Sequence, residues 1–306
     1  MLERLEMSGN NFGNLKVSGA NYAYNKSLLG DIFLPNNNLT SVELTDNNYC
    51  LRNIDLSGNQ LTEISFKDAD RLETLNISGN QLTTLDVNYS TQLTALNAAN
   101  NMLVSVTLPT EHHLTTLNLE GNALDFNTLP AVTGINQYTY APQRDVTISK
   151  QGPGVDLSYY MYDDKTTYAW TKEGTTLTSG THYSEDGGKF VFDPSLIGST
   201  LTCQMSNSHY PGLTINTSQF TVLGMPTNQI ASFTTLESQT GTLTLRSQSD
   251  GNTICIDWNG DGSGLEYNNA GTAVATFEVQ SKAGATAKVY TYNEKSDIIV
   301  FGLSDL

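Results

Sequence analysis

The chain has 306 residues, and 31 acidic against 15 basic residues give it a formal net charge of −16. This balance argues against nucleic acid as a partner, because phosphate binding needs a clustered basic surface and the sequence contains none. Only 15% of the residues are charged and 38% are hydrophobic, so the composition is that of folded domains and not of a charged disordered chain.

No apolar stretch approaches the roughly 18 residues that a transmembrane helix needs, and the first ten residues lack the pattern of a signal peptide. We expect no transmembrane segment in this chain, and either an intracellular protein or an export signal upstream. The three cysteines, Cys50, Cys203 and Cys255, are odd in number and far apart, so the sequence does not indicate a disulfide framework.

The N-terminal half contains an internal repeat with the pattern L-x-x-L-x-L-x-x-N-x-L. Its asparagines are Asn10, Asn37, Asn59, Asn80, Asn101 and Asn122, with spacings of 27, 22, 21, 21 and 21 residues. A period of about 21 residues is typical of a leucine-rich-repeat solenoid, in which each coil buries its leucines against its neighbours. The asparagines are expected to satisfy backbone groups in the turns. The period ends after Leu124, and residues 129–134 are interpreted as the exit from the solenoid.

The second half of each repeat, at residues 61–66, 82–87 and 103–108, ends in alternating apolar residues with β-branched neighbours. This pattern predicts a short extended segment on the convex side of each coil and not a helix. The units, of the form N-x-L-T-x-L-D-V, resemble the short repeats of internalin-like leucine-rich-repeat proteins of bacterial surfaces. The resemblance covers about residues 1–130 and implies the fold more directly than the biology.

Solenoids of this kind bind through their concave sheet, so the outward positions of its strands are candidate ligand-binding positions. The candidates are Phe33, Tyr22, Tyr24, Asp31, Asn53, Asp55, Asn76, Asn97 and Asn118. Aromatic rings beside hydrogen-bonding side chains suit a protein hot spot or a sugar-stacking platform. The alternative is that the polar side chains only solvate a flat sheet and the two tyrosines only cover an irregular turn.

Residues 141–223 alternate short strands with turn signals, which predicts an antiparallel β-sandwich. The expected strands are residues 155–162, 167–172, 189–192, 200–206 and 213–222. Trp170 and Cys203 resemble residues of strands C and F in an immunoglobulin-like domain, and the resemblance implies that Trp170 packs in the core. The expected strand B has no cysteine, so Cys203 is predicted to be a buried, unpaired thiol.

Residues 224–306 predict a second small β-sandwich, with strands at 242–247, 253–258, 274–280, 286–292 and 297–301. Asp257, Asn259 and Asp261, followed by Gly262, match the opening of a calcium-binding loop. The twelfth position of that loop is Asn268 and not glutamate, and strands flank it. A structural hairpin turn is therefore favoured, similar to that of polycystic-kidney-disease-type modules, and calcium is the alternative.

The sequence contains none of the common catalytic motifs, so we expect no catalytic residues, no enzyme activity and no cofactor other than calcium. The fold class is mainly β: a leucine-rich-repeat solenoid at residues 1–140 followed by two β-sandwich domains. The resemblance implies a secreted or cell-surface adhesion protein that binds a host or bacterial surface protein or a glycan. The alternative is a structural stalk of a larger surface protein. Half of the net charge lies in residues 1–140, which favours neutral or basic partners.

Overall fold

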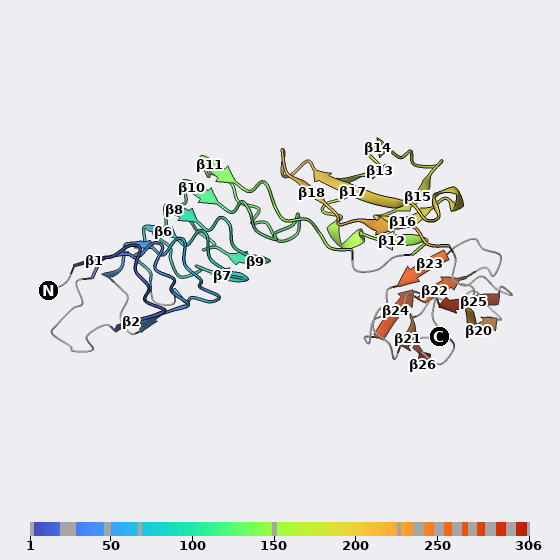
Figure 1. Cartoon of the computed structure of the whole chain (residues 1–306), viewed down its shortest axis with the longest axis horizontal. Coiled ribbons are helices and arrows are strands. Elements are labelled where there is room, and N and C mark those ends of the chain that lie inside the picture. Colours follow the sequence, from blue (N-terminus) through green and yellow to red (C-terminus); the bar gives the residue numbers. More distant parts are fainter. Residues whose placement is uncertain are drawn as a thin grey trace. The chain divides into compact units, whose positions relative to one another are not determined.

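The structure is a computed structural model, and its secondary structure is almost entirely β (Figure 1). It describes residues 3–18, 29–45, 50–66, 69–148, 152–224, 228–234, 242–247, 254–258, 265–268, 274–278, 286–291 and 298–304. The chain divides into two compact units. The first contains residues 1–145, 165–167 and 205–216, and the second contains the remainder.

The N-terminal region is built on a seven-stranded parallel sheet. In order across the sheet, its strands are β1 (Arg4–Glu6), β3 (Asp31–Phe33), β5 (Asn53–Asp55), β6 (Thr74–Asn76), β8 (Ala95–Asn97), β10 (Thr116–Asn118) and β11 (Gln137–Thr139). Each central residue from β3 to β10 is an isoleucine or leucine that is at most 2% exposed. The two residues beside it face away from this core, because side chains alternate along a strand. The apolar pattern thus builds the predicted solenoid core.

On the opposite side of the coils, short parallel strands confirm the prediction of extended segments in place of helices. β2 (Asn14–Ser18) pairs with β4 (Ser41–Thr45), and β7 (Thr84–Asp86) pairs with β9 (Ser105–Thr107). Residues 61–66 are described but form no strand. The extended segments keep each repeat short, because a helix would need more residues per coil.

A ladder of buried asparagines links the successive coils. In its centre, the Asn101 Nδ2 donates to the carbonyl oxygens of Ile77 at 3.0 Å and Ala98 at 3.1 Å. The Asn101 Oδ1 accepts from the backbone nitrogen of Leu82 at 3.1 Å. Asn101 is 0% exposed, so these bonds satisfy an amide that would otherwise be costly to bury. Asn59, Asn80 and Asn122 repeat this arrangement.

The solenoid continues one coil beyond the end that the sequence predicts after Leu124. Gln143 stands 21 residues after Asn122 and takes the next position in the ladder. Its Oε1 accepts from the Leu124 backbone nitrogen at 3.1 Å, and its Nε2 donates to the Leu119 carbonyl at 2.9 Å. Strand β11 carries Tyr138 in register with Leu117 of β10. This coil has tyrosine in place of leucine and glutamine in place of asparagine, so it does not match the consensus sequence of the repeat.

Aromatic side chains cover the core of this last coil. Tyr210, which belongs to the same compact unit, is 4% exposed and stacks on Phe126 at 6.4 Å between ring centroids. Its hydroxyl donates to the Leu129 carbonyl at 2.9 Å. Burial raises the pKa of the Tyr138 hydroxyl, which donates to the Pro130 carbonyl at 3.1 Å. Large amphipathic rings thus close the apolar end of the coil while their hydroxyls keep partners.

The region that follows forms two antiparallel sheets, an arrangement compatible with the predicted β-sandwich. One sheet has the order β12 (Gly154–Asp156), β16 (Lys189–Phe192) and β15 (Tyr183–Asp186). The other has β14 (Thr175–Thr176), β13 (Thr166–Lys172), β17 (Thr200–Asn207) and β18 (Thr214–Asn216), with β19 (Phe220–Thr221) also paired to β17. The two 3₁₀ helices in this region are η2 (Ser158–Tyr160) and η3 (Pro194–Leu196). The immunoglobulin-like assignment stays a prediction.

Two of the five strand predictions in this region differ from the structure. The strand expected at 155–162 ends at Asp156, because the Asp156 Oδ1 accepts from the backbone nitrogen of Ser158 at 2.9 Å and closes a turn before η2. Strands β14 and β15 were not predicted, and the strand expected at 213–222 is divided into β18 and β19. Strands of two to four residues, such as β14, β15, β18 and β19, are too short for an alternation of apolar and polar residues to stand out from a loop.

Trp170 forms the aromatic centre of this region, as the sequence predicts. It is 0% exposed, and its ring meets those of Phe190, Phe192 and Phe220 at centroid distances of 5.4, 4.9 and 6.1 Å. All three contacts are edge-to-face, the geometry that the quadrupoles of aromatic rings favour. Cys203 is a free thiol that is 1% exposed, which confirms the prediction for this residue.

Stability should fall at alkaline pH partly because of Cys203. Burial raises the pKa of its thiol from 9.0 to about 12. In the unfolded chain the Cys203 thiol ionises with its ordinary pKa of 9.0. The stability that the buried neutral thiol contributes is therefore fully present below about pH 9 and is lost as pH rises toward 12. Urea unfolding between pH 8 and 11 measures the effect. The Cys203→Ala variant should show a shallower decline than the parent, and parallel declines would contradict this assignment.

The C-terminal region also forms two antiparallel sheets among its described residues. One has the order β20 (Asn228–Thr234), β25 (Thr286–Thr291), β22 (Ile254–Asp257) and β23 (Leu265–Asn268). The other has the order β24 (Val274–Glu278), β21 (Thr242–Ser247) and β26 (Ile298–Ser304). Five of these strands overlap the predicted ones, whereas β20 and β23 were not predicted. The division of the whole chain into three domains remains a prediction.

Candidate functional site

The outer face of the seven-stranded sheet, which the sequence assigns as concave, carries two columns of aligned side chains. The first column consists of Arg4, Asp31, Asn53, Thr74, Ala95, Thr116 and Gln137. The second consists of Glu6, Phe33, Asp55, Asn76, Asn97, Asn118 and Thr139. Seven of the nine predicted binding residues therefore share this face. Tyr22 and Tyr24 lie outside the described residues.

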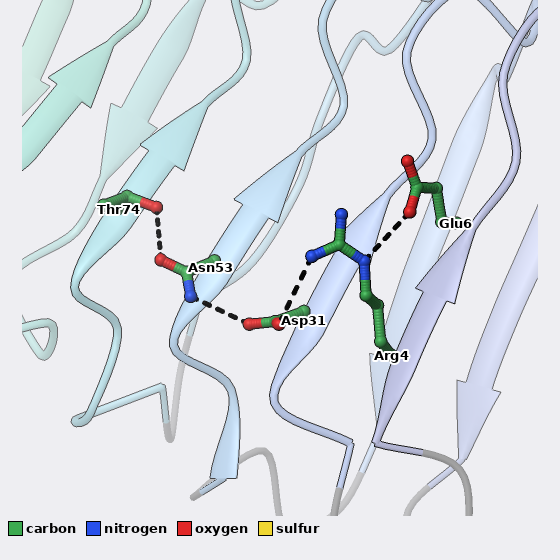
Figure 2. A network of polar contacts seen from close by, with 5 residues as sticks. All are labelled: Arg4, Glu6, Asp31, Asn53 and Thr74. Carbon is green, nitrogen blue, oxygen red and sulfur yellow. Dashed lines mark hydrogen bonds and ion pairs between the residues drawn. The ribbon is translucent and has the colours of Figure 1, made fainter.

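At the N-terminal end of this face, polar side chains bond to one another across four strands (Figure 2). The Thr74 hydroxyl donates to the Asn53 Oδ1 at 2.7 Å, and the Asn53 Nδ2 donates to the Asp31 Oδ1 at 2.8 Å. Asp31 then lies 3.9 Å from the Arg4 guanidinium, which donates to Glu6 at 2.9 Å. The chain of contacts satisfies these groups within the sheet.

Phe33, the predicted aromatic anchor, is covered by a cation. The Arg4 guanidinium carbon lies 4.3 Å from the centroid of the Phe33 ring. Such a contact contributes about 0.5–1 kcal/mol at an exposed site. A ligand that stacks on Phe33 must therefore displace Arg4. Arg4 is not among the predicted binding residues. Its contact with the ring is diagonal between β1 and β3, because its register partner is Asp31, and so no local sequence pattern indicates it.

Further along the second column, the Asp and Asn side chains have a structural role. The Oδ1 atoms of Asp55, Asn76, Asn97 and Asn118 each accept from the backbone nitrogen two residues later, at 2.9, 3.2, 3.2 and 3.1 Å. These Asx turns end each strand of the sheet. The oxygen of each side chain is therefore engaged by the fold, and only the remaining polar atoms of the group are left for a ligand.

The predicted calcium loop is only partly described. Asp257, at the end of β22, is 2% exposed and stands in register with Leu265 and Lys288 of the two adjacent strands. Asn259 and Asp261 lie outside the described residues. Across the described ranges, no group of three or more His, Cys, Asp or Glu side chains is placed to hold a metal ion. Calcium binding at this loop therefore stays an untested alternative.

The repeat that carries the asparagine ladder matches a known protein family. The family model described as Leucine Rich Repeat matches residues 71–90, which contain Asn80 and its buried leucines. The same hydrogen bonds recur in the coils on either side. The N-terminal region is a leucine-rich-repeat solenoid.

A solved structure with a similar chain is the functional domain of InlJ from Listeria monocytogenes, which includes a cysteine ladder. The sequence identity is 16% and the TM-score is 0.35 over 72% of this chain, which spans 62% of the length of that domain. No curated protein matches the chain. In the part of this chain that is described, no helix has the length and hydrophobicity needed to cross a membrane.

Proposed function

We propose that this chain is a non-enzymatic binding protein that attaches to a protein or glycan at a cell surface through the outer face of its leucine-rich-repeat solenoid. The observation that carries the proposal is the register of the sheet, which aligns polar side chains over seven strands as one continuous surface. Leucine-rich-repeat solenoids present such extended sheets for binding. A secreted or surface location follows from the internalin-like repeats of the sequence and belongs to the same proposal.

The middle of this face is suited to contact with a large partner. Ala95 stands between Thr74 and Thr116 in the first column, and the next outward residue of the same strand is Asn97. Small and short side chains leave the surface flat and let a partner approach the sheet closely. The acidic excess of residues 1–140 favours neutral or basic partners over anionic ones.

Substitution of Ala95 by tryptophan tests the proposal, because a large ring at the centre of the face should block an extended ligand. The immobilised protein is first screened against a glycan array and a panel of host and bacterial surface proteins. We expect any ligand found to bind Ala95→Trp at least about tenfold more weakly, which corresponds to about 1.4 kcal/mol. Binding is measured by surface plasmon resonance.

The matched control is Val104→Trp, which adds the same ring at a residue that is 50% exposed and lies next to β9. This variant should bind as the parent does. Equal loss in both variants, or no loss in either, would place the binding site elsewhere.

A structural stalk is the second candidate function, and the network of Figure 2 favours it. There the charged and polar groups of four strands are paired with one another, as in a sheet that is only solvated. If the parent protein binds no member of the glycan and protein panels, a structural stalk becomes the better-supported function.

A further inference from the structure

Three outward asparagines, Asn76, Asn97 and Asn118, form a row across strands β6, β8 and β10. They are register partners, so each stands beside the next on the neighbouring parallel strand. Neighbouring strands lie about 4.8 Å apart, so the row repeats one amide group at about that interval. We call these three asparagine side chains the amide row.

The fold holds each amide of the row in one orientation. The backbone N–H two residues later is a donor, so the atom that meets it must be the oxygen of the amide. The Nδ2 groups of Asn76 and Asn97 donate no hydrogen bond within the described part of the chain. That of Asn118 makes one long bond, at 3.4 Å to the Glu120 carboxylate. The row therefore presents oriented donors that are available to acceptors on a ligand.

The residues beside the amide row leave it accessible from above. Thr74, Ala95 and Thr116 flank it on one side. Ser78, Ala99 and Glu120 follow it on the other side, and the Ser78 hydroxyl bonds back to Asn76 at 2.8 Å. Five of these six side chains are no longer than threonine, so a flat ligand can lie on the row at Asn76 and Asn97. Glu120 is the exception, beside Asn118 at the β10 end.

The interval of the row discriminates between classes of polymer. An extended peptide advances about 3.3–3.4 Å per residue, so carbonyls on one side recur at about 6.6–6.8 Å and fall out of step with the strands. Nucleic acid is disfavoured by the net charge of −16. A chain of β-linked hexoses is neutral and advances per sugar unit by a length close to the strand spacing. Both edges of each flat ring carry oxygen acceptors, so every unit offers an acceptor to the row even where successive units are turned over.

We infer that the amide row is a subsite for a linear, neutral, β-linked polysaccharide that lies across β6, β8 and β10 with one sugar unit per strand. The inference rests on the proposed function and deepens it by naming the class of ligand. Each Nδ2 group donates to a sugar oxygen, while each Oδ1 stays with its turn.

The chain itself supplies the variant that tests this subsite. Asp55 occupies the same position one coil before Asn76, and its Oδ1 accepts from the Ser57 backbone nitrogen at 2.9 Å. Aspartate therefore supports the same turn. Asn97→Asp keeps the acceptor that Ala99 needs and replaces the donor in the middle of the row by a charged oxygen.

Titration calorimetry with cellohexaose and chitohexaose measures the effect. We expect at least one of them to bind the parent, and its dissociation constant to rise about tenfold or more in Asn97→Asp. Asp55→Asn lengthens the row by one donor and should lower the dissociation constant severalfold. Asn88→Asp is the control: it makes the same charge change at an exposed residue beyond β7, and it should bind as the parent does.

Failure of both hexaoses to bind the parent would overturn the inference, as would equal binding by Asn97→Asp and the parent. If an extended peptide binds the parent and Asn97→Asp abolishes that binding, the assignment of the ligand as a glycan is overturned. The proposed function fails separately, since it predicts weaker binding of any ligand by Ala95→Trp. If a protein ligand binds Asn97→Asp as it binds the parent but no longer binds Ala95→Trp, the proposal of binding through the outer face stands. In that case only the polysaccharide subsite is rejected.

Discussion

Replacement of Asn101 by alanine should lower the free energy of unfolding of the solenoid by about 1–3 kcal/mol. The side chain is 0% exposed, and its removal leaves the buried Leu82 backbone nitrogen without its partner. The Ile77 and Ala98 carbonyls each lose one of two asparagine donors and keep the other, from Asn80 and Asn122 respectively. Leu82 and Ile77 belong to the preceding coil and Ala98 to the coil of Asn101, so the loss weakens the interface between these two coils. Urea unfolding followed by circular dichroism measures the change.

The control for this variant is Asn88→Ala, which removes an asparagine side chain at an exposed position near the same coils. Its effect should stay within about 0.5 kcal/mol, as for most surface substitutions. A loss below about 1 kcal/mol for Asn101→Ala would show that water or local rearrangement replaces the ladder bonds.

Replacement of Trp170 by alanine should lower the free energy of unfolding of the second compact unit by about 3–5 kcal/mol. The indole is 0% exposed and has edge-to-face contacts with Phe190, Phe192 and Phe220. Alanine would leave a cavity among rings that cannot collapse fully into it. The unfolding transition is followed by far-ultraviolet circular dichroism.

Trp170→Phe separates the aromatic contacts from the rest of the effect. The buried Trp170 Nε1 has no hydrogen-bond partner in the described part of the chain, so phenylalanine removes an unsatisfied donor and keeps a ring. We expect its cost to be less than half that of alanine. Equal costs for the two variants would show that the volume of the indole, and not its aromatic contacts, is what stabilises this core.

The sequence was sufficient to predict the solenoid, because its signal is local and repeated. Each coil places leucines at fixed distances from an asparagine, and the period of about 21 residues then determines which side chains are neighbours in the sheet. A separate argument, the resemblance to an immunoglobulin-like domain, predicted that Trp170 and Cys203 are buried, and both are. The repeat pattern did not predict the last coil, because Tyr138 and Gln143 differ from the consensus residues although they take the same structural positions.

The strand boundaries outside the solenoid were harder to predict for a related reason. Short strands such as β15 alternate weakly, and turns such as that at Asp156 depend on one side-chain hydrogen bond. Neither feature leaves a pattern long enough to stand out from a loop. Pairing between strands that are distant in sequence supplies the information that the local pattern lacks.

For the candidate site, the sequence by itself determined which residues share the outer face, since side-chain direction alternates along a strand and the repeat fixes the register. Only the tertiary structure decided what those residues do there. It placed Arg4 over Phe33, joined Asp31 to Asn53, and engaged the Asn97 oxygen in a turn while its amide nitrogen remained available. The physical reason is that contacts between coils join residues more than twenty positions apart, and the rotamers that make them depend on neighbours that only the folded sheet brings together.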